Sequence, residues 1–392
     1  MRVLVAHNRY RAELPSGENQ VVDAEIAALT AAGVDVVTYL RSSDEIPSMP
    51  AREKALVPLR PLHSREAVAD VDRLIRLHQP DLLHLHNAFP LISWSVVRRA
   101  HDRGLPVVVT LHNHRHSCMR GSYFRDGAPC TLCRGLTLPW PAVRHGCYRD
   151  SRLQSVPMAV AFAAHRADQR SVDRYIALTE AGATSILESG LARPDQVVVR
   201  PNTVPDPGPV TAPGRGLLFV GRLTREKGVP LLLDAWERAG RPFGTLTVVG
   251  DGPERPAVEA AARAAGSGVV ATGPLDHALV TDAIAASAAV VVPSTSPEAL
   301  PLVVLEAFAQ GRPVVATDSG GLADAVDDSV GWLAAPSAPD LATVLADAAR
   351  DGGATRGHAA RERYDARYAP DVVLAAQVEI YRSVIDERRS RH

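Results

Sequence analysis

Two basic side chains near the start of a predicted helix are the first candidates for chemistry in this sequence. Arg222 follows the apolar run GLLFVG, and Lys227 comes one short turn later, just before a helix expected from Gly228. Two cations beside the positive end of a helix can bind a diphosphate and neutralise it as it leaves a reaction centre. A solvated basic loop is the alternative. Only two of the 43 basic residues are lysines, Lys54 and Lys227, which favours a specific role for Lys227.

Two carboxylates follow in the segment SPEALPLVVLEAFAQGRPVVA, residues 296–316. Glu298 lies in the loop after a predicted strand, and Glu306 lies within a helical run that is otherwise apolar. A carboxylate on a largely buried helix needs hydrogen-bond donors, which the two hydroxyls of a ribose supply. The loop carboxylate could accept hydroxyls of a sugar in the same way. Glu306 could instead face water or pair with an arginine. The sequence of this helix alone therefore does not decide whether Glu306 binds a ribose.

Histidines end two of the predicted strands in the first half of the chain. His112 follows the apolar run PVVVTL, which directs its side chain to the end of the sheet where ligands bind. The alternative is that His112 belongs to a surface group with His114 and His116. His84 and His86 could line an acceptor pocket, but packing at a strand end explains them better.

Short β-rich runs alternate with helical periods along the whole chain. Strands are predicted at 2–6, 34–39, 81–85, 106–111, 174–178 and 196–199, and then at 216–221, 245–250, 268–271, 288–292 and 313–316. This alternation predicts an α/β protein with two doubly wound parallel sheets, each covered by helices on both faces. Ligands of such sheets bind at the carboxyl ends of the strands.

A segment rich in proline and glycine, RPNTVPDPGPVTAPGRG, separates the two halves and predicts a domain boundary. We therefore predict a first domain over residues 1–203, a linker over 204–214 and a second domain over 215–370. A cysteine-containing insertion occupies 112–152 of the first domain. The C-terminal segment, 371–392, opens with a helical period.

Taken together, these motifs resemble family 4 of the retaining glycosyltransferases. The resemblance rests on GR-x4-KG, followed by E-x7-E and PVVAT-x-SGG, and it extends to SGENQVV, PDLLHLHN and VVVTLH in the first half. It implies a GT-B fold, in which two Rossmann-like domains face a central cleft and the last helix braces the first domain. It also implies transfer of a hexose from a UDP- or GDP-sugar to an acceptor hydroxyl, with retention, in bacterial glycan, glycolipid or natural-product biosynthesis.

The resemblance assigns roles to single residues. Arg222 and Lys227 match the family's diphosphate-binding pair, and Glu298 matches the carboxylate that contacts the donor sugar. Glu306 matches the carboxylate that binds the ribose. In the family, the first domain places a histidine near the donor sugar and a glycine near the diphosphate. His112 and Gly17 match these two residues. The predicted catalytic residues are His112, Glu298, Arg222 and Lys227.

The start of the E-x7-E helix departs from the family pattern. Many relatives have Gly-Phe-Gly after the first glutamate, where this chain has Ala299, Leu300 and Pro301. Pro301 has no N–H to offer a phosphate, so we expect Leu302 and Val303 to be the main-chain donors. No motif identifies a carboxylate nucleophile of the glycosidase type. By analogy with the family, the leaving phosphate deprotonates the acceptor on the same face of the sugar.

All four cysteines lie within the insertion, at Cys118, Cys130, Cys133 and Cys147. The C-x2-C pair with two flanking cysteines predicts a structural zinc site with four thiolate ligands. Unliganded thiols and disulfides are the alternatives, although a cytoplasmic protein disfavours disulfides. The family needs no metal or other cofactor for the transfer itself.

The composition of the chain limits the classes of partner that we expect. A net charge of −1 gives no reason to expect a nucleic acid. No uncharged apolar run approaches the ~18 residues of a membrane span, so we expect a cytoplasmic protein. The segment 112–152 carries seven arginines against Asp126 and Asp150. A solvated loop explains this charge, and attraction to an anionic acceptor or peripheral contact with the inner face of the membrane is the alternative.

Three other functions fit parts of the sequence. A nucleotide-sugar epimerase of the same fold, and a non-catalytic binder of nucleotide sugars, would share these motifs. The four intact residues Arg222, Lys227, Glu298 and Glu306 argue against the binder. A dinucleotide oxidoreductase is disfavoured, because no G-x-G-x-x-G follows the first strand and GDGPER has the wrong spacing.

Overall fold

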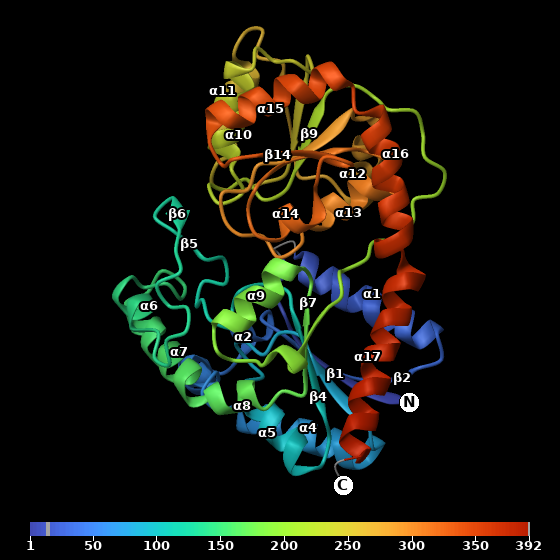
Figure 1. Ribbon diagram of the computed structural model, residues 1–392. Coiled ribbons are helices and arrows are strands. Elements are labelled where there is room, and N and C mark those ends of the chain that lie inside the picture. Colours follow the sequence, from blue (N-terminus) through green and yellow to red (C-terminus); the bar gives the residue numbers. More distant parts are fainter. Residues whose placement is uncertain (13–15, 391–392) are drawn as a thin grey trace. The chain divides into compact units, whose positions relative to one another are not determined.

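The computed structural model describes residues 1–12 and 16–390, and its chain divides into two units, each built on a six-stranded parallel sheet (Figure 1). The first unit comprises residues 1–122, 131–200 and 373–392, and the second comprises 123–130 and 201–372. The division at 200/201 lies close to the predicted boundary. The short piece 123–130 of the insertion groups with the second unit, which the sequence did not indicate.

The first sheet has the strand order β2-β1-β3-β4-β7-β8, and every neighbouring pair is parallel. Its order reverses between β1 and β3, and at such a point the loops leave to opposite faces and open a space for ligands. The strands are β1 (Arg2–Arg9), β2 (Asp35–Ser42), β3 (Leu82–Leu85), β4 (Val107–Leu111), β7 (Arg174–Ala177) and β8 (Val197–Val199).

The helices of this unit connect the strands and cover the sheet. They are α1 (Gly17–Ala31), α2 (Glu45–Ser48), α3 (Ala51–Leu56), α4 (Arg65–His78), α5 (Ser95–Asp102), α6 (Trp140–Arg144), α7 (Arg152–Ala164), α8 (Arg166–Arg170), α9 (Glu180–Glu188) and α17 (Pro370–Ser390), with 3₁₀ turns η1 (Val57–Leu59) and η2 (Pro194–Gln196). None of the helices in the described residues is long and apolar enough to cross a membrane.

Two hydrophobic clusters lie on the two faces of the first sheet, because successive residues of a strand point to opposite sides. Leu4 and Ala6 of β1 belong to one cluster, and Val3 and Val5 belong to the other. The second cluster also contains Tyr381, Val384 and Ile385 of α17, which are all buried. The last helix therefore packs on the sheet of the first unit.

The second sheet has the strand order β11-β10-β9-β12-β13-β14, again with every pair parallel. The strands are β9 (Leu217–Val220), β10 (Leu246–Val249), β11 (Val269–Gly273), β12 (Ala289–Val292), β13 (Val314–Thr317) and β14 (Gly331–Ala334), and a hairpin is formed by β5 (Phe124–Arg125) and β6 (Ala128–Pro129). The order reverses between β9 and β12, the Rossmann arrangement. Each predicted strand is present, whereas the edge strand β14 was not predicted.

The helices of the second unit are α10 (Val229–Arg238), α11 (Arg255–Arg263), α12 (His277–Ala286), α13 (Leu302–Ala309), α14 (Gly321–Ala325), α15 (Ala338–Asp351) and α16 (Ala354–Arg363), followed by the π-helical turn η3 (Tyr364–Tyr368). Residues of the predicted linker pack on this unit. The buried guanidinium of Arg312 donates to carbonyl oxygens of Thr211 and Ala212, and Arg361 pairs with Asp206. Segment 204–214 is therefore attached to the second unit by arginine contacts that composition could not reveal.

Candidate active site

The loops after β9 and β12 lie side by side, because these two strands are neighbours where the order of the second sheet reverses. The backbone N–H groups of Thr295 and Ser296 donate to the carbonyl of Glu226 at 2.9 and 3.3 Å. Gly228 makes this close approach possible, since it has φ of +75° and a Cβ at that position would lie 1.8 Å from the carbonyl oxygen of Pro293. Any other residue at position 228 would push the two loops apart.

Lys227 and Glu298 meet across these two loops. The Lys227 Nζ donates to Glu298 Oε1 at 2.7 Å, and the Ser294 hydroxyl donates to the same oxygen at 2.6 Å. Burial by itself would raise the pKa of Glu298, but Lys227 and Ser294 outweigh burial and hold that pKa below its usual value. Glu298 is therefore ionised at neutral pH and holds the lysine ammonium at the reversal point of the sheet.

Arg222 lies on the same loop as Lys227 and is far more exposed. Its side chain is 59% exposed and pairs with Glu226 at 3.0 Å. Its charge also contributes to lowering the pKa of Glu298, which places it electrostatically near the lysine–glutamate pair. Because exposed ion pairs are weak, the guanidinium can exchange Glu226 for an incoming anion at little cost. The structure thus gathers three of the predicted residues, Arg222, Lys227 and Glu298.

The position of Glu298 is fixed by a second close approach. The N–H of Gly321 donates to the Glu298 carbonyl at 2.7 Å. Gly320, with φ of +60°, leaves no room for a side chain, since a Cβ there would lie 2.7 Å from the same carbonyl oxygen. The two glycines of the PVVAT-x-SGG motif therefore hold the loop that carries Glu298 against the loop after β13.

Helix α13 carries the remaining predicted residues of the second unit. Pro301 is its N-cap, so Leu302 and Val303 lie in the first turn, where N–H groups have no partner within the helix. Glu306 is one turn further along, with a side chain 18% exposed and His277 of α12 at 3.9 Å. Burial raises the pKa of Glu306, and His277 partly opposes this. Among the described residues, no hydrogen bond joins Glu306 to Lys227 or Glu298.

In the first unit, His112 and His86 follow the neighbouring strands β4 and β3 and contact each other. His112 Nε2 and His86 Nδ1 are 2.9 Å apart, and the two rings stack with centroids at 5.2 Å. Burial lowers the pKa of His86 to about 4, and burial together with His86 lowers the pKa of His112 well below its usual value. Both rings are therefore uncharged at pH 7. Each can donate one hydrogen bond and accept one, but neither carries the extra proton that a general acid would give up.

Gly17 is the first residue of α1 and is exposed. The N-cap Ser16 accepts a hydrogen bond from the Asn19 N–H, and the Asn19 side chain contacts His7 Nε2 of β1 at 3.0 Å. These contacts fix the first turn of α1 against β1, on the side of the sheet where its order reverses. Helix N-termini attract anions, so the position of Gly17 suits the approach of a phosphate.

Two family models match most of the chain. The model for the glycosyl transferase 4-like domain matches residues 16–203, and the model for glycosyl transferases group 1 matches residues 214–351. The 2-deoxystreptamine N-acetyl-D-glucosaminyltransferase of Streptomyces fradiae is 30% identical over 339 residues, which cover 80% of this chain and 73% of the relative. The chain belongs to the group 1 glycosyltransferases, of the family 4 type.

Solved structures show that this glycosyltransferase has the GT-B fold. Sucrose-phosphate synthase from Thermosynechococcus elongatus superimposes with a TM-score of 0.70 at 21% identity, over 98% of this chain and 99% of that one. HepE from Anabaena, in complex with UDP-glucose, gives a TM-score of 0.64 at 20% identity, over 98% and 100% of the two chains. A second relative, the 2-deoxystreptamine glucosyltransferase of Streptomyces kanamyceticus, is 29% identical over 300 residues, 74% of this chain and 73% of the relative.

Two polar residues of the glycosyltransferase were missed or set aside by sequence reasoning. His86, which the sequence analysis assigned to packing, contacts His112 directly. Glu18 lines a small cavity together with His86, His112 and Asn113, and it accepts hydrogen bonds from Tyr10 and Asn113 at 3.3 and 3.1 Å. Burial raises the pKa of Glu18 to about 7. The sequence does show that Glu18 is an acid in the first turn of the predicted SGENQ helix. It does not show that this side chain is buried.

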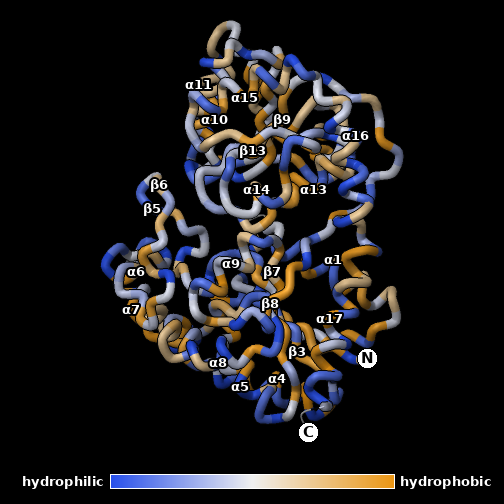
Figure 2. The backbone as a smooth tube through the Cα atoms, viewed as in Figure 1, coloured by the Kyte–Doolittle hydropathy of each residue, from blue (hydrophilic) through white to orange (hydrophobic). Residues whose placement is uncertain are grey.

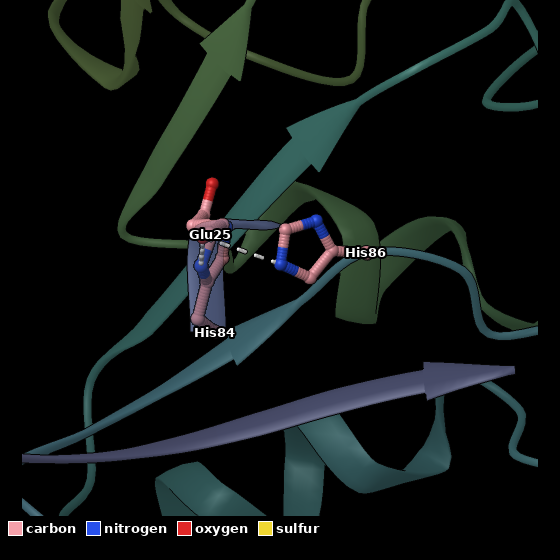
Figure 3. Close-up of side chains that lie close together, drawn as sticks. All are labelled: Glu25, His84 and His86. Atoms are coloured by element: carbon pink, nitrogen blue, oxygen red, sulfur yellow. Dashed lines mark ion pairs between the residues drawn. The ribbon is translucent and has the colours of Figure 1, made fainter. Parts of the chain in front are cut away.

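One group of described residues is close enough to hold a metal ion, and it consists of Glu25, His84 and His86 (Figure 3). Arg200 lies 2.7 Å from the Glu25 carboxylate and already neutralises it. His84 is engaged on both sides, with the Tyr381 hydroxyl 2.6 Å from Nδ1 and Thr110 2.8 Å from Nε2. A cation would have to displace the tyrosine and lie beside a buried arginine, so a hydrogen-bonded network fits this group better.

The four cysteines are partly buried, and Cys133 and Cys147 pack against the core of the first unit. Zinc binding by Cys118, Cys130, Cys133 and Cys147 stays a prediction.

Glu18 predicts a pH dependence of stability. Its pKa is raised from 4.5 to about 7 in the folded state, so the folded protein keeps a proton that the unfolded chain loses. Folding stability should therefore fall as pH rises from 4.5 through about 7. Glu18→Gln should remove this fall and be more stable than wild type by about 1–3 kcal/mol at pH 8, with a smaller gain at pH 5. Urea unfolding at both pH values measures the difference.

The matched control is Glu180→Gln, which changes an exposed glutamate in the first turn of α9. It should shift the unfolding midpoint equally at both pH values. A Glu18→Gln variant that behaves like this control would show that Glu18 is not held protonated.

Proposed function

We propose that this glycosyltransferase moves a hexosyl group from a UDP- or GDP-sugar to an acceptor hydroxyl, with retention of the anomeric configuration. The observation that carries the proposal is the contact of Lys227 with Glu298, beside Arg222, where the second sheet reverses its order. Two cations suit a diphosphate, and a carboxylate next to them suits sugar hydroxyls. HepE, which shares the fold, has been crystallised with UDP and with UDP-glucose.

The residues of the second unit would act on the leaving group. Arg222 and Lys227 would neutralise the negative charge that builds up on the diphosphate as the glycosidic bond breaks. The N–H groups of Leu302 and Val303 point from the first turn of α13 and would add main-chain donors. Glu306, mostly buried on the same helix, would accept hydrogen bonds from ribose hydroxyls.

The residues of the first unit would act on the sugar. His112 is neutral and half-buried, so it would hydrogen-bond a sugar hydroxyl without adding charge near an oxocarbenium-like centre. Gly17 at the start of α1 would let the diphosphate approach the helix N-terminus. We further propose that the departing phosphate oxygen takes the proton of the acceptor hydroxyl on the same face of the sugar, which yields retention without a covalent intermediate on the enzyme.

Product analysis tests this function. Purified protein is incubated with UDP- and GDP-hexoses and candidate acceptors, and the anomeric proton of the product is examined by NMR. An α-linked donor should give an α-linked product and free nucleoside diphosphate. A β-linked product would contradict retention. Conversion of the donor to another nucleotide sugar in the absence of acceptor would instead indicate an epimerase.

We also propose that the enzyme contacts a membrane surface through helix α7 and the loop before it. The exposed side of α7 is apolar, with Leu153, Val156 and Val160 at helical spacing, and Leu153 is 83% exposed. Figure 2 shows the hydrophobic character of this helix. The segment before it exposes further large apolar side chains, Leu132, Leu136, Leu138 and Trp140.

The segment before α7 contacts that helix, and exposed arginines occur along both. Helix α6 packs against α7, and Thr137 of the loop shares a surface hollow with Ala164 and Arg170. Exposed arginines flank the apolar residues, at positions Arg144, Arg149, Arg152 and Arg170. Apolar side chains that insert below cationic ones are typical of contact with an anionic bilayer. Such a contact favours a lipid-linked acceptor, whereas the two relatives named as 2-deoxystreptamine glycosyltransferases favour a small-molecule acceptor.

Vesicle binding tests the proposed membrane contact. Wild type should co-sediment with vesicles of phosphatidylglycerol and phosphatidylcholine, and much less with phosphatidylcholine alone. Replacing Leu153, Val156 and Val160 together by serine should weaken binding about tenfold or more, because each inserted side chain contributes on the order of 1 kcal/mol. Leu77→Ser, which changes an exposed leucine of α4, is the matched control. Absence of wild-type binding to the anionic vesicles would contradict the membrane contact.

A further inference from the structure

A network of buried and half-buried polar side chains runs through the first unit from α17 to His112. The Tyr381 hydroxyl lies 2.6 Å from His84 Nδ1, and the same nitrogen lies 3.0 Å from Glu25 Oε1. That carboxylate oxygen lies 3.5 Å from His86 Nε2, and His86 Nδ1 in turn lies 2.9 Å from His112 Nε2. Figure 3 shows Glu25 of α1 close to His84 of β3 and His86 of the following loop, with dashed lines for its ion pairs.

The charges along this chain are fixed by its surroundings. Arg200 pairs with Glu25 at 2.7 Å, and although burial would raise the pKa of Glu25, His84 and Arg200 hold it well below its usual value. Glu25 is therefore an ionised carboxylate, which can only accept hydrogen bonds. His86 and His112 are neutral at pH 7, so each ring carries one proton and has one nitrogen that accepts.

These conditions select one arrangement of protons. The ionised carboxylate faces His86 Nε2 and favours the proton on that nitrogen. His86 Nδ1 is then an acceptor, and the 2.9 Å contact requires His112 Nε2–H to donate to it. His112 Nδ1 is left with a lone pair. That nitrogen is buried and has no hydrogen-bond partner among the described residues, so it can accept a hydrogen bond from a ligand.

We propose that Glu25 is a positioning residue, which sets the proton on His86 and thereby makes His112 present the Nδ1 lone pair to a hydroxyl group of the donor sugar. Without the carboxylate, the two rings could equally carry their protons on Nδ1, with His86 donating to His112 Nε2. His112 would then present an N–H to the same hydroxyl. The identity of the ligand rests on the proposed function, whereas the arrangement of protons does not.

The experiment measures the proton positions directly. In protein labelled with ¹⁵N-histidine, two-bond ¹H–¹⁵N correlation spectra distinguish the Nε2–H from the Nδ1–H tautomer of each ring. Wild type at pH 7.5 should show Nε2–H tautomers for both His86 and His112. Glu25→Gln can donate an amide N–H to His86 Nε2, and it should convert both rings to Nδ1–H tautomers.

Two further measurements keep the test decisive. Tyr381→Phe removes the hydroxyl that lies next to His84 and 3.4 Å from Glu25 Oε1, but it leaves the charge of the carboxylate in place, so the tautomers of His86 and His112 should not change. In turnover assays, Glu25→Gln should lower kcat about tenfold or more with a smaller change in the KM of the nucleotide sugar, since the donor diphosphate contacts lie elsewhere.

The outcomes separate cleanly. An Nδ1–H tautomer of His112 in the wild type overturns the proposal without any variant, and so does an unchanged His112 tautomer in folded Glu25→Gln. The spectra require neither donor nor acceptor. If the tautomers are as expected but no sugar is transferred, the proposed function fails and the assignment of Glu25 to His112 stands.

Discussion

One ion pair between two loops organises the candidate site of the second unit. Lys227 follows β9 and Glu298 follows β12, and these strands are hydrogen-bonded neighbours only because the order of the sheet reverses there. Gly228 allows the backbones to approach, and the carbonyl of Glu226 binds the loop after β12. The ion pair is mostly buried, so its charges are held where water screens them weakly. Under the proposed function, the ammonium held in this position would bind the diphosphate of the donor.

The first unit has the same sheet architecture, but the side chains at the carboxyl ends of its central strands are neutral and not cationic. Its histidines at the carboxyl ends of β3 and β4 are kept neutral by burial, and the carboxylate of Glu25 next to them is neutralised by Arg200. A neutral, hydrogen-bonding surface suits a sugar hydroxyl, whereas the cationic loops of the second unit suit a phosphate.

Much of the fold and part of the site could be predicted from sequence. The strands of both sheets were found because parallel strands buried on both faces are continuous apolar runs. Arg222, Lys227 and Glu298 were found because a basic turn and a lone acid after such runs are local signals.

The edge strand β14, GWLA, is short and partly exposed, so it lacks that signal. Glu18, Glu25 and His86 depend on which loops and helices meet, and no local pattern reveals their partners.

Calorimetric titration with UDP and GDP tests the central claim most directly. Whichever nucleoside diphosphate binds the wild type should bind Lys227→Met at least about tenfold more weakly, because a charge-assisted contact to phosphate is lost. Lys54→Met replaces the other lysine, which lies exposed on α3, and it should bind like the wild type. Equal affinity of Lys227→Met and Lys54→Met for the diphosphate, or no binding of either nucleotide by the wild type, would contradict the account.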